Sequence, residues 1–244
     1  MGKASIKIGD RFETKYGPCE VVDYQGCDKV YVKFDNTGGI TKTNSTDLRR
    51  DQVKDWYYPI VENKGWFGQG KYKARMNNKI TPEYQIWQGM LKRCYNEVIL
   101  QKEPSYRGCE VCKEWLDFQV FGDWMNSIDY RKDGWQLDKD LLFKNNKIYC
   151  PEKCCFIPAR LNKALAINKI TNKSLPIGVA LNKGKYTVTM NTNGYPKYLG
   201  IYKTPEEASE IYKEKRLEYL YSIAYEENCP KFIIDKLKSF VYGC

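Results

Sequence analysis

Cysteine thiols are the first side chains in this chain whose spacing could do chemistry. The 244 residues include ten cysteines, of which Cys109 and Cys112 form a CxxC pair. Such pairs commonly supply two ligands of a tetrahedral Zn²⁺ site. Cys150 with Cys154 or Cys155 could supply the other two, although Cys150 and Cys154 have CxxxC spacing. We therefore predict a zinc site, with simple packing of these thiols as the alternative.

Lysine side chains form the second group. Residues 163–203 contain seven lysines and no aspartate or glutamate, in a chain whose formal charge is +10. Concentrated positive charge is typical of proteins with a polyanionic partner. A polyanion is therefore the partner we expect, and a lysine-rich surface that only contacts water is the alternative.

The composition also limits where the protein acts. Hydrophobic residues make up 42% of the chain, which is enough for packed cores in a few small domains. No apolar run approaches the roughly 20 residues that span a bilayer, and the first residues lack the apolar segment of a signal peptide. We expect a soluble, cytoplasmic protein with no membrane partner and with reduced thiols.

The elements that must position these residues begin with residues 1–58. Within them, DRFETKYGPCEVVDYQGCDKVYVKFDNTGGITKT alternates β-branched and aromatic residues with polar ones and is interrupted by turn-forming glycines. The pattern predicts four or five short antiparallel strands. The VVDY and VYVKF strands resemble those of the KOW and Tudor families, which implies a small β-barrel.

Residues 59–80 contain NKGWFGQGKYKARMNNK, a loop rich in glycine, lysine and aromatic residues. Its rings could stack on bases and its cations could meet phosphates. The residues concerned are Trp66, Phe67, Tyr72, Lys64, Lys71, Lys73 and Arg75. The alternative is an ordinary linker with aromatic anchors. The following TPEYQIWQGMLKRCY predicts a helix that begins after Thr81, with an apolar face in the core.

Residues 173–228 have the pattern of three strands and a helix, followed by a tail at 229–244. The helix TPEEASEIYKEKRLEYLYSIAYE opens with a cap residue, a proline and two acids. The segments IGV, KYTVTM and YLGIYKTPEEASEIY resemble, in order and spacing, the plant ethylene-response-factor type of DNA-binding domain. This resemblance implies that one face of a three-stranded sheet lies in the major groove.

The resemblance also assigns DNA contacts to six residues on the sheet. They are Lys183, Lys185, Thr187, Thr189, Asn191 and Lys197. Strand alternation independently puts residues 185, 187 and 189 on one face, and leaves Tyr186 as either packed or in contact with DNA. The arginines that often read guanine in the family are missing. Because lysine suits phosphates better than bidentate base recognition, we expect limited sequence specificity.

Residues 81–172 resemble the HNH nucleases, in the branch found in many phage proteins. The resemblance rests on YQIWQGMLKRCY, YRGCEVCKEWLDFQVFGDW and LDKDLLFKNNKIYCPEKCCFIPARLN. It implies a ββα-metal core with the activity of a homing endonuclease. In that branch a cysteine at the place of Cys154 is a packed core residue, which competes with the zinc prediction.

Transferred position by position, the resemblance assigns four roles to this core. The metal-binding acid falls on Asp138, the general base on Lys139, the structural asparagine on Lys153 and the second metal ligand on Asn162. Oxygen ligands of this kind suit Mg²⁺, which would polarise the scissile phosphate and stabilise the leaving oxygen. Asp140 would share a face with Asp138 if the strand continues, and is a further candidate ligand.

The base is the weak point of this nuclease prediction, because the chain has no histidine. A lysine is normally charged at neutral pH and cannot accept a proton in that state. Asp140, Glu152 or a metal-bound water could then serve as the base.

These patterns predict an α+β protein and leave three functions open. The first is a DNA-binding protein of the HNH homing-nuclease class that acts as a slow, Mg²⁺-dependent nickase. The second is a catalytically degenerate DNA-binding or host-interfering protein on the same scaffold. The third is an RNA-binding accessory factor, which only the N-terminal barrel and the glycine-aromatic loop support. The missing histidine favours the second function, whereas Asp138 and Asn162 favour the first.

Overall fold

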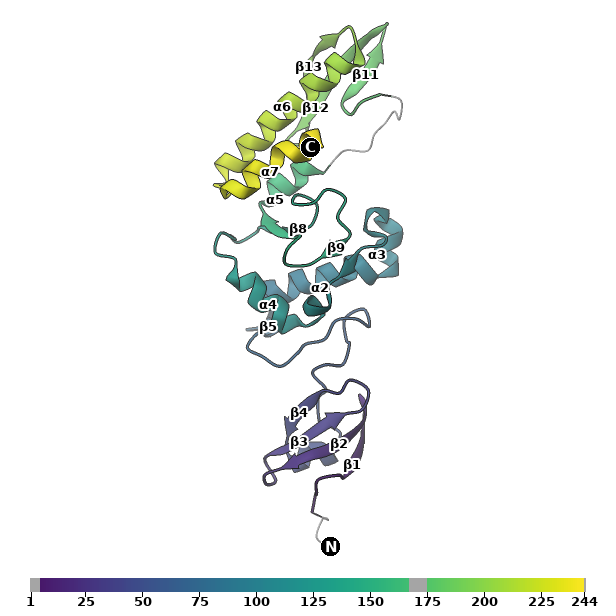
Figure 1. The fold of residues 1–244 in the computed structure, drawn as a ribbon, viewed down its shortest axis with the longest axis vertical. Coiled ribbons are helices and arrows are strands. Elements are labelled where there is room, and N and C mark those ends of the chain that lie inside the picture. Colours follow the sequence, from purple (N-terminus) through teal and green to yellow (C-terminus); the bar gives the residue numbers. More distant parts are fainter. Residues whose placement is uncertain (1–4, 167–174, 244) are drawn as a thin grey trace. The chain divides into compact units, whose positions relative to one another are not determined.

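The computed structural model describes residues 5–166 and 175–243 (Figure 1). The chain divides into two compact units, Met1–Ser127 and Ile128–Cys244, and this division falls inside the predicted 81–172 segment. The fold is α+β, as the sequence indicates, with several small sheets. Lys169 and Lys173 of the basic stretch lie outside the described residues. No described helix is both long and apolar enough to cross a membrane.

The first unit opens with an antiparallel sheet in the order β1-β2-β3-β4. Its strands are β1 (Arg11–Thr14), β2 (Gly17–Tyr24), β3 (Val30–Phe34) and β4 (Ile40–Thr43). Alternate residues of the central strands, such as Val21, Val32 and Phe34, are fully buried on one face. Helix α1 (Ser45–Arg49) follows, with the Asn44 side chain as its N-cap. Among the described strands, none of the pairings joins β1 to β4, so closure into the expected barrel is not observed.

The glycine-rich linker packs onto the rest of the first unit through its aromatic residues. The Trp66 indole donates a hydrogen bond to Asp117 at 3.1 Å. The rings of Phe67 and Tyr72 both pack against Phe118, with centroids 5.8 and 6.4 Å away. Because these rings are engaged inside the unit, the structure favours aromatic anchors over base stacking.

Helices α2 (Pro82–Tyr95) and α4 (Phe118–Ser127) form the core of the remaining part of this unit. The smaller elements are β5 (Arg75–Met76), β6 (Lys79–Ile80), α3 (Glu97–Lys102), β7 (Glu110–Val111) and two 3-10 turns at Pro104–Tyr106 and Lys113–Leu116. The predicted apolar face of α2 is confirmed, since Trp87, Met90 and Leu91 are fully buried. Thr81 precedes α2, but its hydroxyl donates to the carbonyl of Lys73 at 2.6 Å instead of capping the helix.

The second unit begins with two antiparallel strands and a helix. These are β8 (Gln136–Asp138), β10 (Cys155–Ile157) and α5 (Ala159–Leu165), with the short strand β9 (Ile148–Tyr149) in the intervening loop. Leu137, Phe156 and Leu161 are buried between the strands and the helix. The sequence therefore forms a β-β-α unit at the place where the nuclease resemblance expects one.

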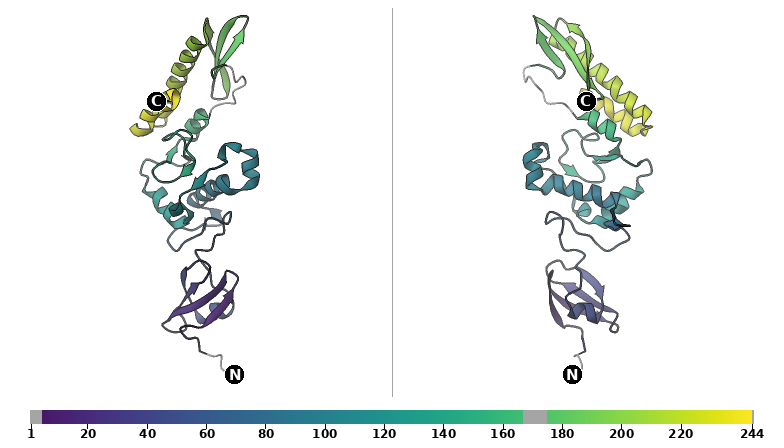
Figure 2. Two further views of the ribbon diagram at one scale, coloured as in Figure 1. Left: turned by 45° about the vertical axis from the view of Figure 1, so that its right-hand side comes forward. Right: turned by 180° about the vertical axis from the view of Figure 1, so that it is seen from behind.

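A three-stranded antiparallel sheet with a long helix completes the predicted C-terminal pattern. Its elements are β11 (Val179–Asn182), β12 (Lys185–Thr192), β13 (Tyr195–Tyr202) and α6 (Pro205–Glu226). Figures 1 and 2 show α6 running along one face of the sheet. Gly178 has a φ of +76°, and a Cβ there would overlap the ring of Tyr212. Close packing of the helix therefore requires glycine at this position.

Residues 229–244, expected as a tail, contain helix α7 (Lys231–Tyr242), which packs on α6. The helix starts directly after Pro230, and its residues Ile233 and Leu237 are fully buried. These two residues are four apart and so share a helical face. That spacing is the signal in the sequence that the expectation of a tail missed.

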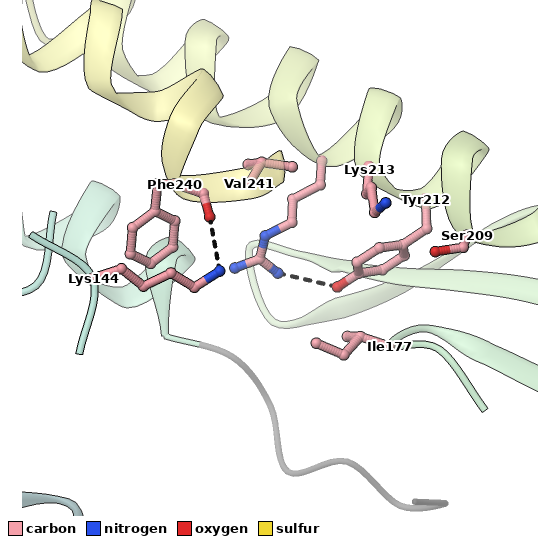
Figure 3. A pocket seen from close by; sticks show the side chains of 8 residues that line it. Lys144, Ile177, Ser209, Tyr212, Lys213, Phe240 and Val241 are labelled. Carbon is pink, nitrogen blue, oxygen red and sulfur yellow. Dashed lines mark hydrogen bonds between the residues drawn. The ribbon is translucent and has the colours of Figure 1, made fainter. Parts of the chain in front are cut away.

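A small cavity lies between the loop after β8 and helices α6 and α7, and Figure 3 shows Lys144 beside Phe240 at its wall. Arg216 also lines the cavity and donates to the carbonyls of Ala164 and Leu165, each at 3.1 Å. Lys144 donates to the carbonyl of Phe240 at 3.4 Å. Cations are favourable at helix C-termini, so both side chains stabilise the last turns of α5 and α7.

Candidate functional site

The β-β-α unit places one predicted metal-site residue, Asp138, on β8 and the other, Asn162, on α5 beside this strand. In the register of β8 and β10, Asp138 pairs with Cys155. Asn162 on α5 donates from Nδ2 to Oε1 of Gln136 at 2.8 Å. Because Gln136 and Asp138 are alternate residues of β8, they share a face. Asn162 therefore lies beside the face of the strand that carries Asp138.

The Asp138 carboxylate closes the turn that follows β8. Its Oδ1 accepts the backbone N–H of Asp140 at 3.0 Å and that of Leu141 at 2.7 Å. Burial raises the pKa of this carboxyl above its ordinary value, while the two backbone hydrogen bonds act in the opposite direction. Asp138 thus has a structural role, whatever else it binds.

Lys139, at the position of the expected general base, is a buried cross-link. Its side chain is among the few buried charged groups of the described chain, with 6% of the residue exposed. The ammonium lies 2.7 Å from both Asp140 carboxylate oxygens and 2.8 Å from the carbonyl of Asn146. An ammonium has three donors, so all of them are used. This geometry argues against a role for Lys139 as proton acceptor.

Asn146, which the sequence analysis did not single out, completes the cross-link. Its Nδ2 donates to the carbonyls of Lys139 at 3.0 Å and Ile148 at 2.7 Å, and its Oδ1 accepts the Ile148 N–H at 3.0 Å. A buried amide must satisfy its polar atoms in this way. The signal in the sequence was the turn-forming pair Asn145-Asn146. In the structure Asn145 has a φ of +61°.

Lys153 and Glu152 lie in the turn before β10. The backbone N–H of Lys153 donates to the Cys150 carbonyl at 3.2 Å, and α5 begins only at Ala159. A hydrogen bond from its own backbone amide, followed by one from Cys150, lowers the pKa of the Glu152 carboxyl. A lowered pKa makes Glu152 a weaker base than an ordinary glutamate.

Each of the two units contains two of the four cysteines of the predicted zinc site. Cys109 and Cys112 lie in the first unit, while Cys150 and Cys154 lie in the second. Within the described ranges, no group of three or more cysteine, aspartate or glutamate side chains is close enough to hold a metal ion. Burial raises the pKa of Cys155, the alternative ligand, well above that of an ordinary thiol. The zinc site therefore remains a prediction that rests on the spacing of the cysteines in the sequence.

The β11–β13 sheet has one face against α6 and one face open. Val188 and Met190 of β12 are buried with Ala208 and Tyr212 of α6. Tyr186 also packs with this buried cluster. The residues of β12 that alternate with these point away from α6, and we call their side of the sheet the open face. Its members on β12 are Lys185, Thr187, Thr189 and Asn191. Lys183, in the turn before β12, is exposed beside them.

Lys197 is not on the open face. Its cross-strand partner in the register is Met190, whose side chain is buried on the α6 side. Cross-strand partners point to the same face of a sheet. Lys197 therefore points to the α6 side, although it is exposed there. The sequence pattern could not reveal this, because a register shift at Val188/Thr189 separates the two halves of the β12–β13 pair.

Two apolar residues on the open face were missed by the sequence analysis. Tyr198 pairs with Thr189, and Ile201 pairs with Thr187. Tyr198 is 60% exposed and Ile201 is 54% exposed. Their signal was the alternation YLGIY in β13, in which Leu199 packs inward. The open face thus combines amines, hydroxyls, an amide and two uncovered apolar side chains.

Comparisons with protein-family models, with curated proteins and with solved structures found no match to this chain.

Proposed function

We propose that this chain is a duplex-DNA-binding protein that contacts DNA through the open face of the β11–β13 sheet. The observation that carries the proposal is the composition of that face. Lysine, threonine and asparagine side chains line β12, and helix α6 covers only the opposite side. Tyr198 and Ile201, which are 60% and 54% exposed, add apolar surface to this face that a partner could cover.

The charge around this face suits a polyanion. Residues 163–203 have no aspartate or glutamate, so no carboxylate on the sheet opposes a phosphate. Lys183 and Lys185 are both exposed at one end of β12. Lysines bind phosphates largely as point charges, which gives salt-dependent binding with little sequence information. Thr189 could contact either base edges or phosphates, whereas the Thr187 hydroxyl already donates to the Ala180 carbonyl at 3.0 Å.

In this proposal the β-β-α unit is a scaffold. The lysine at the base position is committed to Asp140 and Asn146, and Asp138 accepts two backbone N–H groups. Lys139 would have to leave structural hydrogen bonds to take its nuclease role, whereas the turn engages only Oδ1 of the Asp138 carboxylate. This favours the catalytically degenerate DNA-binding protein over the nickase. The N-terminal KOW-like or Tudor-like barrel and the ethylene-response-factor type of the C-terminal domain belong to the same proposal.

A charge placed on the open face tests the proposal. Thr189→Glu puts a carboxylate opposite the phosphates and should abolish the shift of a duplex in a gel mobility assay. Ser222→Glu adds the same charge at an exposed site of α6 and should bind almost as the wild type does. Equal binding by the two variants would show that the open face is not the DNA contact.

A slow metal-dependent nickase is the second candidate, because Asn162 lies beside the face of β8 that carries Asp138. Oxygen atoms of these two side chains suit Mg²⁺, which would stabilise the leaving oxygen of a phosphodiester. Supercoiled plasmid incubated with Mg²⁺, Mn²⁺ or EDTA tests this function. Nicking that needs the metal and disappears in Asp138→Asn, a variant that keeps the turn acceptor, would favour the nickase.

A further inference from the structure

We infer that the β5–β6 hairpin is a second DNA contact, which enters the major groove and recognises A·T pairs. This inference rests on the proposed DNA-binding function and deepens it. The hairpin belongs to the first unit, so it is a separate element from the open face of the β11–β13 sheet.

The hairpin is small and entirely exposed. Arg75 pairs with Ile80 and Met76 pairs with Lys79. The turn between them is Asn77-Asn78, with φ values of 48° and 62°. Two consecutive residues with positive φ are typical of the two-residue turns that fit the twist of a hairpin, and asparagine tolerates this conformation. Each of the residues 75–80 is exposed to solvent.

The base of the hairpin is held by hydrogen bonds to α4 and by a bond across its own stem. The Tyr72 N–H donates to Oε1 of Gln119 at 2.9 Å, and Nε2 of Gln119 donates back to the Tyr72 carbonyl at 3.0 Å. On the other strand, the Thr81 N–H donates to the Ala74 carbonyl at 3.0 Å. The exposed tip is therefore presented by a rigid support, which lowers the entropy cost of binding.

The exposed side chains match the chemistry of a nucleic-acid groove. Met76 is 62% exposed and Ile80 is 46% exposed, and each has a cation as its cross-strand partner. Residues 69–82 contain four cations and no acid. One of these cations, Lys71, is paired with Asp123 at 3.0 Å. The other three are Lys73, Arg75 and Lys79, and the pairs Arg75–Ile80 and Met76–Lys79 put one cation and one apolar side chain on each face of the hairpin.

The width and the exposed side chains of the hairpin suit the major groove. Paired strands lie about 4.8 Å apart, and their side chains widen the ribbon further. A major groove about 12 Å wide admits such a two-stranded ribbon. The major groove also displays the thymine methyl group, which apolar side chains contact, and the adenine N6/N7 edge, which asparagine binds. The tip asparagines Asn77 and Asn78, together with the apolar side chain of either face, Met76 or Ile80, therefore form a combination suited to A·T pairs.

Removal of the thymine methyl group tests this recognition. The affinity of the full chain would be measured for one A·T-rich duplex and for the same duplex with deoxyuridine in place of thymidine. The two duplexes differ only by methyl groups in the major groove. The wild type should bind the thymine duplex more tightly, by about threefold to fourfold for each methyl group that the hairpin touches.

The variants identify the hairpin as the source of any preference. Met76→Ala/Ile80→Ala should bind the two duplexes equally and more weakly than the wild type binds the thymine duplex. Val98→Ala, a control on α3 in the same unit whose side chain is 57% exposed, should keep the wild-type preference. A wild type that does not distinguish the duplexes, or a double variant that still does, would overturn the inference.

Adding Lys185→Ala and a single-stranded RNA to the series separates this inference from the proposed function. If Lys185→Ala weakens duplex binding while every protein binds both duplexes equally, the open face is a DNA contact and the hairpin is not. If the wild type binds no duplex, both proposals fail. Tighter binding of a single-stranded RNA than of either duplex would also overturn the major-groove assignment.

Discussion

The ammonium of Lys139 lies 2.7 Å from each carboxylate oxygen of Asp140. The two residues are neighbours in the chain, and their ion pair is completed by a third hydrogen bond to the carbonyl of Asn146. The Lys139 side chain is 8% exposed and the Asp140 side chain is 42% exposed. The pair therefore fixes the start of the loop after β8 from inside, at the place where a nuclease of the HNH class would have its base.

Removal of the Lys139 ammonium should destabilise the second unit. Lys139→Met keeps most of the side-chain volume but loses three hydrogen bonds, which should cost about 1 to 3 kcal/mol because the solvent-exposed Asp140 can be rehydrated. The shift of the urea midpoint measures this loss. Lys163→Met, an exposed control on α5, should leave the midpoint unchanged. Equal midpoints for Lys139→Met and the wild type would contradict the cross-link.

Histidine at position 139 should not create a nuclease. An imidazole has at most two N–H donors and cannot replace the three donors of the ammonium. We expect Lys139→His to be less stable than the wild type and to nick supercoiled plasmid no faster in Mg²⁺. A gain of Mg²⁺-dependent nicking in this variant would instead support the nickase function.

The turn after β8 makes a separate prediction for Asp138. Asp138→Asn keeps an oxygen acceptor for the N–H groups of Asp140 and Leu141 and removes a charge whose pKa is raised by burial. Its stability should therefore stay within about 0.5 kcal/mol of the wild type or increase. Asp138→Ala loses the acceptor and should cost about 1 to 2 kcal/mol. Equal destabilisation by the two variants in urea would refute the turn-closing role.

Tyr130 should make the second unit sensitive to alkali. Burial raises the pKa of its phenol to about 12, and the N–H of Phe156, which donates to the oxygen, acts in the opposite direction. An unfolded tyrosine has a pKa of about 10. Between these values the unfolded state has lost a proton that the folded state keeps, so stability falls as pH rises through this window.

The comparison of Tyr130→Phe with the wild type isolates this effect. The difference in unfolding free energy should be constant below the unfolded pKa and should shift in favour of Tyr130→Phe as pH rises above it. Tyr225→Phe removes a hydroxyl whose residue is 64% exposed and serves as the control. A difference between Tyr130→Phe and the wild type that does not change with pH would contradict the burial of this hydroxyl.

Metal content tests the predicted zinc site. Four thiolates from Cys109, Cys112, Cys150 and Cys154 would give freshly purified protein about one equivalent of zinc, and a chelator would lower its melting temperature. Cys109→Ser/Cys112→Ser should lose the metal, whereas Cys27→Ser, at an exposed thiol, should keep it. Protein without zinc in elemental analysis would leave these thiols as packed side chains.

The local patterns of the sequence are enough to predict many of the elements. The turn signals at Lys183-Gly184 and Asn193-Gly194 separate β11, β12 and β13. The Thr204 side chain caps α6 by accepting the backbone N–H of Glu207, as its position before the helix predicts. These features depend on residues close together in the chain. Helix α7 also depends on a local pattern, because its buried residues Ile233 and Leu237 are four apart. The segment was expected to be a tail because it is short.

Features that depend on distant residues could not be predicted in the same way. The side of the sheet to which Lys197 points follows from a register shift between β12 and β13. The partners of Lys139 depend on how the loop to Asn146 folds back. The nuclease resemblance identified Lys139 as the candidate base, but it could not show that the ammonium has no free donor.

The salt dependence of duplex binding tests the central claim most directly. Affinity would be measured over a series of salt concentrations for the wild type, for Lys183→Ala/Lys185→Ala and for Lys197→Ala. We predict that the double variant binds more weakly and that its salt slope is smaller by about 2, roughly 1 for each phosphate that loses its lysine. Lys197→Ala, on the α6 side, should change the slope much less. A double variant with the affinity and the salt slope of the wild type would contradict DNA binding by the open face.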